Sequence, residues 1–124
     1  MITFSFDIET NIRTATYSGS ISDGELIASY QALLTRPDYN PTAKDLVDLR
    51  LVDRFNVSSE ALRNLISMYN PKDRLGHRPR LAIISASDFT YGMSRIYEML
   101  RGDEVSEEIH IFRNYDDAVL WLQS

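Results

Sequence analysis

Apolar stretches of two kinds alternate along this chain, and the alternation limits the folds open to it. Short runs rich in β-branched and aliphatic residues, typical of strands, occur at residues 2–9, 12–19, 43–52, 80–85 and 108–112. From the second run onward, each is followed by apolar residues at helical spacing. Strands that alternate with helices are joined by right-handed parallel crossovers. We therefore predict an α/β fold of order ββαβαβαβα, with a mixed, mainly parallel five-stranded sheet and about four helices.

The helices are predicted to begin at polar capping residues. Ser22 and Glu25 have the spacing of a capping box, in which the serine oxygen accepts a hydrogen bond from the first turn. Ser58, Ser87 and Asn114 stand in the same position before the other three helical stretches. Each helix therefore has a defined start, and a single domain over residues 1–124 accounts for the whole pattern.

Composition and charge exclude several classes of protein. The chain has 124 residues, no cysteine and a net charge of −5, so disulfides and thiolate metal sites are excluded. Its apolar runs, such as Leu81–Ile84, are too short for a membrane span. We see no signal peptide and expect a cytoplasmic protein. The densest basic segment, residues 72–80, contains Gly76 and Pro79, which indicates a solvated connection rather than a nucleic-acid site.

The sequence gives little support to an enzyme or a metal centre. The two histidines, His77 and His110, lie outside any HExxH or GxSxG signature. Asp45, Asp48 and Asp53 recur around one strand end but lack the regular spacing of a calcium loop, so solvated turns are favoured over a divalent-ion site. We therefore predict no catalytic residue, no metal and no cofactor.

In a mainly parallel sheet, ligands collect beyond the carboxyl ends of the strands, where the helix N-termini gather. In this chain that region comprises the loops at residues 49–58, 85–88 and 113–114, which we name the strand-end edge. Function is expected there.

Several stretches together resemble a known family. They are "DLVDLR", "FNVSSEALRNL", "RLAIISASDFTYGMSRIYEML" and "IHIFRNYDDAVLWL". This path resembles the small stand-alone STAS-like proteins of bacteria, relatives of anti-sigma-factor antagonists that also resemble CRAL-TRIO lipid-carrier domains. The resemblance extends from about Ile12 to Leu122 and implies a five-stranded mixed sheet with helices.

The family likeness also implies a regulated serine. In anti-sigma-factor antagonists, the loop after the strand equivalent to "LVDL" contains an Asp-Ser-Ser-Gly type motif whose serine is phosphorylated by a partner kinase. The matching stretch here is "NVSSEA", which has Val57 and Glu60 at the Asp and Gly positions. The resemblance thus implies a phosphosite at Ser58 or Ser59. Helix capping alone also explains Ser58, and Glu60 would repel a phosphate, so capping is the favoured interpretation.

The leading functional hypothesis is a non-enzymatic regulatory module that binds a protein partner, or a second copy of itself, at the strand-end edge. Two aromatic side chains there are expected to be exposed, Phe55 in a loop and Tyr91 away from the apolar stripe of its helix. The predicted partner-binding residues are Asp53, Phe55, Ser58, Ser59, Ser87, Asp88 and Tyr91.

The alternative hypothesis is a carrier or sensor of a lipid or another apolar small ligand. Phe89, Met93 and Tyr97 share one side of the third predicted helix and are its expected pocket-lining residues. Gly92 interrupts the same helix at a cost of about 1 kcal/mol relative to alanine, which suggests close packing. Ordinary core packing explains Met93 and Tyr97 equally and is the favoured interpretation.

Overall fold

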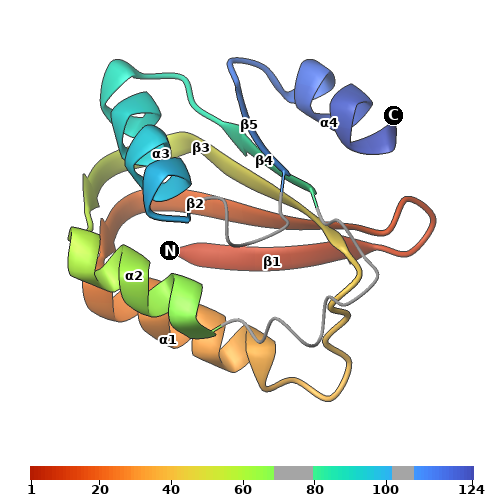
Figure 1. Cartoon of the computed structure of the whole chain (residues 1–124), viewed down its shortest axis with the longest axis horizontal. Helices are drawn as coiled ribbons and strands as arrows, with labels where there is room; N and C mark the ends of the chain where they lie inside the picture. Colours follow the sequence, from red (N-terminus) through yellow and green to blue (C-terminus); the bar gives the residue numbers. More distant parts are fainter. Residues whose placement is uncertain (69–79, 102–107) are drawn as a thin grey trace.

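The computed structural model describes residues 1–68, 80–101 and 108–124, which form one five-stranded sheet in the spatial order β1-β2-β3-β4-β5 (Figure 1). The strands are β1 (Ile2–Asp7), β2 (Ile12–Ser22), β3 (Lys44–Asn56), β4 (Arg80–Ile84) and β5 (Glu108–Phe112). β1 and β2 form an antiparallel hairpin, and β2 to β5 are parallel to one another. The predicted ββαβαβαβα order and the mixed, mainly parallel sheet are confirmed.

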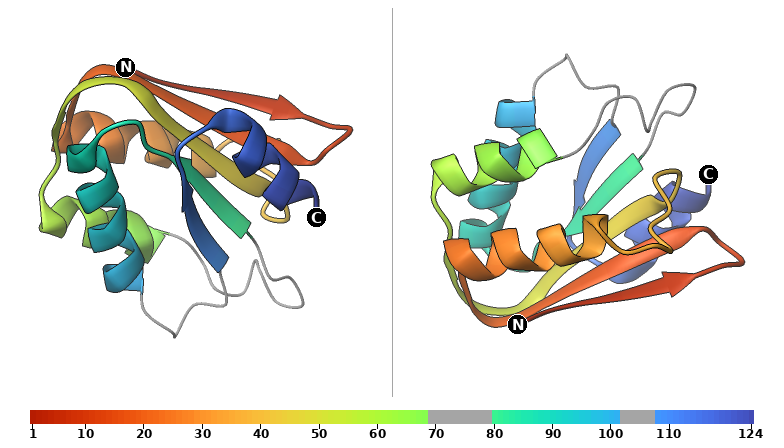
Figure 2. Two further views of the ribbon diagram at one scale, coloured as in Figure 1. Left: turned by 90° about the horizontal axis from the view of Figure 1, so that it is seen from above. Right: turned by 90° about the horizontal axis from the view of Figure 1, so that it is seen from below.

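In the described ranges, four helices cover the two faces of the sheet. They are α1 (Asp23–Leu34), α2 (Ser59–Met68), α3 (Asp88–Arg101) and α4 (Tyr115–Gln123). The helices α1, α2 and α3 share one apolar core with the sheet, whereas α4 closes a second, smaller core built on Leu46, Ala82 and Ile84. Figure 2 shows α4 apart from the other three helices. Because β4 has a helix layer on each face, Leu81–Ile84 is buried without alternation.

All four predicted capping residues start a helix. In each case the side-chain oxygen accepts a hydrogen bond from the backbone N–H three residues further on, at 2.9–3.2 Å. The residues are Ser22, Ser58, Ser87 and Asn114. Each bond satisfies one of the backbone donors that a helix N-terminus leaves without an intrahelical partner.

The strand β3 is longer than the sequence pattern suggested. It was predicted to end at residue 52 but continues to Asn56, paired with the second half of β2. Its pairing with β4 ends at Asp48, so the last part of β3 extends beyond the rest of the parallel sheet. Two register shifts, between Thr16 and Ser18 and between Gly19 and Ser20, each add one residue to β3, so the alternation along β3 is restored after the second.

This extension overturns the prediction that Phe55 is an exposed loop aromatic. Phe55 lies on β3, is only 7% exposed and stacks on the Tyr17 ring at a centroid distance of 6.2 Å. Its side chain lies on the same face of β3 as Leu49 and packs in the core shared with α1 and α2, where burial of the ring stabilises the fold. Phe55 is therefore a core residue and contributes nothing to an exposed surface.

The inward face of α3 also differs from the predicted one. Thr90 and Ser94 are buried, whereas Phe89 is 60% exposed. The two hydroxyl groups can face the sheet because they are hydrogen-bonded: Thr90 to Ser85 at 2.6 Å, and Ser94 to the Thr90 carbonyl at 2.8 Å. This rotation of the helix keeps Met93 against the core and turns Phe89 outward.

No described helix is long and apolar enough to cross a membrane. The basic segment at residues 72–79, with His77 in it, lies outside the described residues.

Two glycines differ in what their backbones require. Gly92 lies inside α3, and a Cβ added there would meet no atom within 4 Å, so the expected close packing at Gly92 is absent. Gly19 has a φ of +69°, in the left-handed region that disfavours side chains.

We predict that Gly92→Ala raises the free energy of unfolding by about 1 kcal/mol, and that Gly19→Ala lowers it by about 1–2 kcal/mol.

Urea unfolding of the two variants beside the wild type measures both effects. A loss of stability in Gly92→Ala would show that α3 is packed against a neighbour at that residue.

Candidate functional site

The strand-end edge lies where the carboxyl ends of β3, β4 and β5 meet the N-termini of α2, α3 and α4 (Figure 1). Six of the seven predicted partner-binding residues are exposed. They are Asp53, Ser58, Ser59, Ser87, Asp88 and Tyr91. Of these, Ser58, Asp88 and Tyr91 contact residues that sequence reasoning did not select.

Ser58 is bound to the start of α1. Its backbone N–H donates to Asp23 Oδ1 and its hydroxyl donates to Asp23 Oδ2, both at 2.7 Å. The same Oγ accepts the capping bond from the Ala61 N–H at 3.1 Å. We call this arrangement the Asp23–Ser58 clasp, because it joins the N-termini of two helices. Asp23 lies 35 residues earlier in the chain, so no local spacing signal marks it as a partner of Ser58.

The loop before α3 is held by a group of hydroxyls. Ser85 is fully buried and donates to the Ser87 carbonyl at 3.0 Å, while the Ser87 and Thr90 hydroxyls lie 2.8 Å apart. These side chains hold the backbone where β4 passes into α3. Ser87 thus acts as the cap and as part of the scaffold beneath the exposed residues that follow.

An aromatic and ionic cluster follows at the start of α3. The Arg113 guanidinium lies 5.1 Å from the centroid of the Tyr91 ring, and its Nη2 is 3.7 Å from Asp88 Oδ1. Tyr91 is 39% exposed, and its neighbour Phe89 is 60% exposed. Arg113 therefore joins α3 to the β5–α4 loop and orders one of the two exposed aromatic residues in the first turn of α3. We call these four residues the α3 aromatic cluster.

The three aspartates considered for a metal ion do not gather. Asp45 and Asp48 lie on opposite faces of β3: Asp45 lines a cavity beneath the helices, whereas Asp48 belongs to the α4 side. In the part of the chain that the structure describes, no three His, Cys, Asp or Glu side chains could share a metal ion.

Asp48 is instead held in an ion pair with Arg50. Arg50 Nη2 lies 2.7 Å from Asp48 Oδ2, and the Arg50 backbone N–H also donates to Oδ1. Burial acts to raise the pKa of Asp48, but these hydrogen bonds outweigh it and hold the pKa below its usual value. The pair therefore stabilises the fold fully above about pH 4, and its contribution is lost as pH falls through the lowered pKa.

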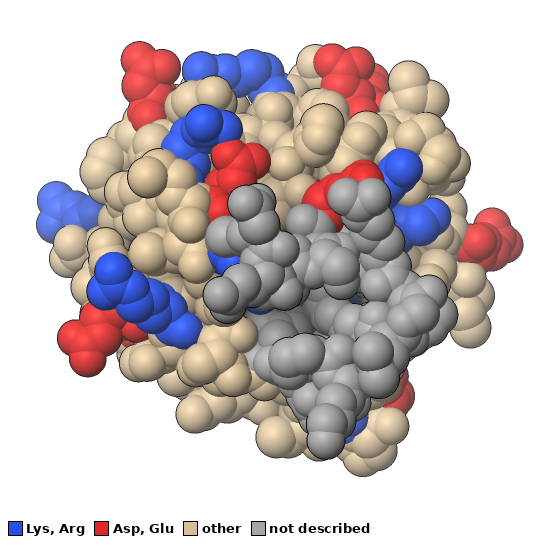
Figure 3. Space-filling model, in the orientation of Figure 1, with Lys and Arg blue, Asp and Glu red and all other residues tan. Residues whose placement is uncertain are grey.

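Basic and acidic side chains are interspersed on the face of the molecule in Figure 3, with no basic patch among the described residues there. His110 is exposed on β5, and its ring stacks on Trp121 at 4.4 Å. His110 is therefore a surface residue whose ring packs against Trp121.

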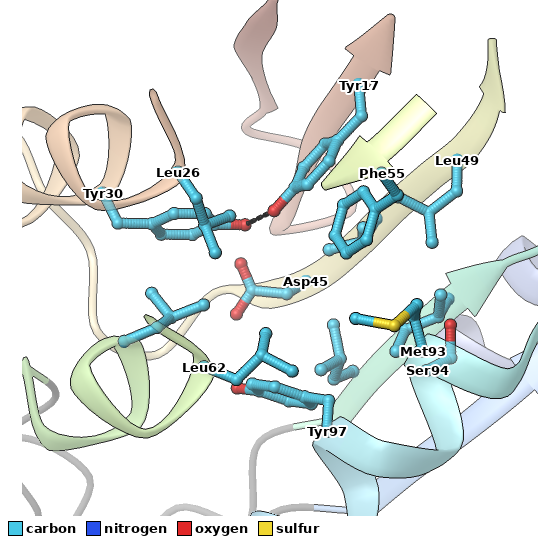
Figure 4. Close-up of a pocket in the computed structure, with 14 residues that line it drawn as sticks. Tyr17, Leu26, Tyr30, Asp45, Leu49, Phe55, Leu62, Met93, Ser94 and Tyr97 are labelled. Atoms are coloured by element: carbon cyan, nitrogen blue, oxygen red, sulfur yellow. Dashed lines mark hydrogen bonds between the residues drawn. The ribbon is translucent and has the colours of Figure 1, made fainter. Parts of the chain in front are cut away.

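An apolar cavity of about 70 Å³ lies between the sheet and the helices α1, α2 and α3 (Figure 4). A water molecule needs roughly 10–15 Å³ of such volume, so the cavity is several times larger than one water. Its lining residues are Tyr17, Leu26, Tyr30, Asp45, Val47, Leu49, Phe55, Leu62, Leu65, Leu81, Ile83, Met93, Ser94 and Tyr97. Met93 and Tyr97 are among them, but Phe89 is not, because α3 turns it to solvent.

One end of the cavity is polar. The Tyr17 and Tyr30 hydroxyls are 2.7 Å apart, and Figure 4 shows the Asp45 carboxylate pointing toward this pair. Arg13 Nε donates to Asp45 Oδ1 at 2.8 Å. Burial, with the adjacent Tyr17 and the negative charge of Asp45, raises the pKa of Tyr30 well above its usual value. Tyr30 therefore stays a neutral hydroxyl over the physiological range.

The Asp23–Ser58 clasp makes a prediction about stability. Ser58→Ala removes the cap and the hydroxyl bond to Asp23 Oδ2 together, and should lower the free energy of unfolding by about 1–2 kcal/mol. Asp23→Ala in the Ser58→Ala background should then cost less than Asp23→Ala alone, as chemical denaturation of the four proteins would show.

Ser59→Ala is the matched control, because Ser59 is exposed one residue further on. It should change stability by less than about 0.5 kcal/mol. Strict additivity of the Asp23 and Ser58 substitutions would contradict the clasp.

Comparison with known proteins bears on the fold. No protein-family model matches the chain, and a search of curated proteins finds no match. Among solved structures, the chain is similar to an uncharacterized protein of the DUF3478 family from Shewanella loihica PV-4, described as having a SpoIIAA-like fold. The TM-score is 0.62 at 17% identity, over 98% of this chain and 92% of that one. The chain therefore has a SpoIIAA-like, that is STAS-like, fold.

Proposed function

We propose that this protein is a non-enzymatic regulatory module that binds a protein partner at the strand-end edge. The observation that carries the proposal is the α3 aromatic cluster, in which Phe89 and Tyr91 are both exposed in the first turn of α3 and Arg113 packs against Tyr91. Tyrosine and arginine are enriched at the residues that dominate protein interfaces. A ring that is already ordered loses less side-chain entropy on binding.

Ser58 supplies a means of regulation within this proposal. Its hydroxyl is at an exposed residue and is bonded to Asp23, so a phosphate on Ser58 would place two like charges in contact and would also face Glu60. Phosphorylation would therefore break the Asp23–Ser58 clasp and loosen α2 from α1. Ser59 is exposed beside it and remains the alternative phosphosite.

Substitution of the exposed aromatic residues tests partner binding. Phe89→Ala with Tyr91→Ala should reduce capture of the partner from an extract of the native host by at least tenfold, because about 1.4 kcal/mol of binding free energy corresponds to that factor. Thermal stability should stay within a few degrees of the wild type, since both side chains are exposed.

Leu120→Ala is the control, because Leu120 is 70% exposed on α4, away from the strand-end edge. It should leave capture unchanged. Equal capture by wild type and by the Phe89/Tyr91 double variant would contradict a binding surface at the α3 aromatic cluster.

We propose as a second candidate function that the cavity holds a small apolar ligand. The cavity supports this proposal because most of its lining is aliphatic or aromatic while a few polar groups converge at one end. Tyr97 and Met93 belong to this wall, as the carrier hypothesis requires.

Native mass spectrometry of protein purified gently from its own host tests this candidate. The wild type should retain an additional small mass, and Met93→Trp, which fills the cavity with a larger side chain, should lose it. A ligand-free mass for the wild type would contradict a carrier role.

A further inference from the structure

We infer that the cavity beneath α1, α2 and α3 selects a small apolar molecule that ends in a neutral hydroxyl group, and that it rejects carboxylates. This inference rests on the second candidate function and specifies the chemistry of its ligand. It therefore separates short alcohols from fatty acids, which share an apolar body and differ in the charge of the head.

The walls of the cavity determine the body of the ligand. Leu26 and Leu62 come from two helices and Leu81 and Ile83 from β4, so aliphatic side chains surround the space from several elements. A volume of about 70 Å³ suits a body of a few carbon atoms. Met93, unbranched and adaptable, can adjust to the shape of the occupant.

The Arg13–Asp45 ion pair determines the charge of the head. Arg13 is 5% exposed and Asp45 is 17% exposed, and their contact of 2.8 Å leaves the pair neutral as a unit. Arg13 is fixed further by a bond to the Asn40 carbonyl at 3.1 Å and by the Tyr39 ring at 4.9 Å. A buried charge without compensation is costly. An added carboxylate would repel Asp45, and an added ammonium would leave a surplus positive charge.

A neutral hydroxyl avoids both costs and finds partners at the polar end. The Tyr17 and Tyr30 hydroxyls and the Asp45 carboxylate converge there (Figure 4). A hydroxyl head can donate to one of these oxygens and accept from another. Because Tyr30 stays protonated, the site offers hydroxyl groups and one balanced carboxylate rather than a second negative charge.

Three ligands of four carbon atoms each test the inference: 1-butanol, butylamine and butyrate. Methionine-methyl NMR reports binding, because Met93 lines the cavity while Met99 is 75% exposed and is an internal control. Butanol should shift the Met93 signal saturably and leave Met99 in place. Butylamine and butyrate should each bind at least tenfold more weakly.

Asp45→Asn tests the cause of the selectivity. Removal of the carboxylate leaves Arg13 positive, so butyrate should bind this variant at least as tightly as butanol does. Asp48→Asn is the matched control. Like Asp45, Asp48 lies on β3 and is paired with an arginine, but it is on the opposite face of the strand, away from the cavity. This variant should keep the preference for butanol. If Asp45→Asn does not fold, Tyr30→Phe is the second variant. It should weaken the binding of butanol severalfold, and its binding of butyrate should stay weak.

The outcomes separate this inference from the function on which it rests. Equal or tighter binding of butyrate by the wild type would overturn the hydroxyl preference while leaving a ligand cavity in place. No saturable shift of Met93 with any of the three ligands would overturn both. A preference for butanol that survives in Asp45→Asn would exclude the ion pair as its cause.

Discussion

The parallel pairing of β2 with β3 is the constraint on which the rest of this structure depends. Its register places Arg13 opposite Asp45 at one end and Ser22 opposite Asn56 at the other. The first pair becomes the buried ion pair beside the cavity. Just beyond the second pair, β2 leads into α1 and β3 leads into α2, which brings Asp23 to Ser58. One strand alignment thus positions both the surface clasp and the polar end of the cavity.

Much of the fold could be predicted because its signals are local. A capping serine and the backbone N–H it binds lie three residues apart, so Ser22, Ser58 and Ser87 could be recognised from short windows. The unbroken apolar run Leu81–Ile84 identified a strand covered on both faces. The order of strands and helices then limited the topology.

The parts of the site that could not be predicted depend on long-range register and on helix rotation. The polar residues 53–54 hid the last part of β3, which is held by its pairing with β2, so Phe55 was wrongly placed in a loop. Buried hydroxyls turn α3, and a stripe chosen by hydrophobicity therefore wrongly includes Phe89. Asp23 lies 35 residues from Ser58, and only the folded sheet brings them together.

The central claim is that one register of β2 on β3 positions both the Asp23–Ser58 clasp and the polar end of the cavity. The chain has no cysteine, so a disulfide between two introduced cysteines has no competing thiol in the protein. Ser20 and Arg54 are exposed register partners, and neighbouring strands about 4.8 Å apart lie within reach of a disulfide. Under oxidation, Ser20→Cys with Arg54→Cys should form an intramolecular disulfide detected by mass spectrometry. Cross-linking in Ser20→Cys with Asn56→Cys instead would mean a register shifted by two residues and would contradict the account.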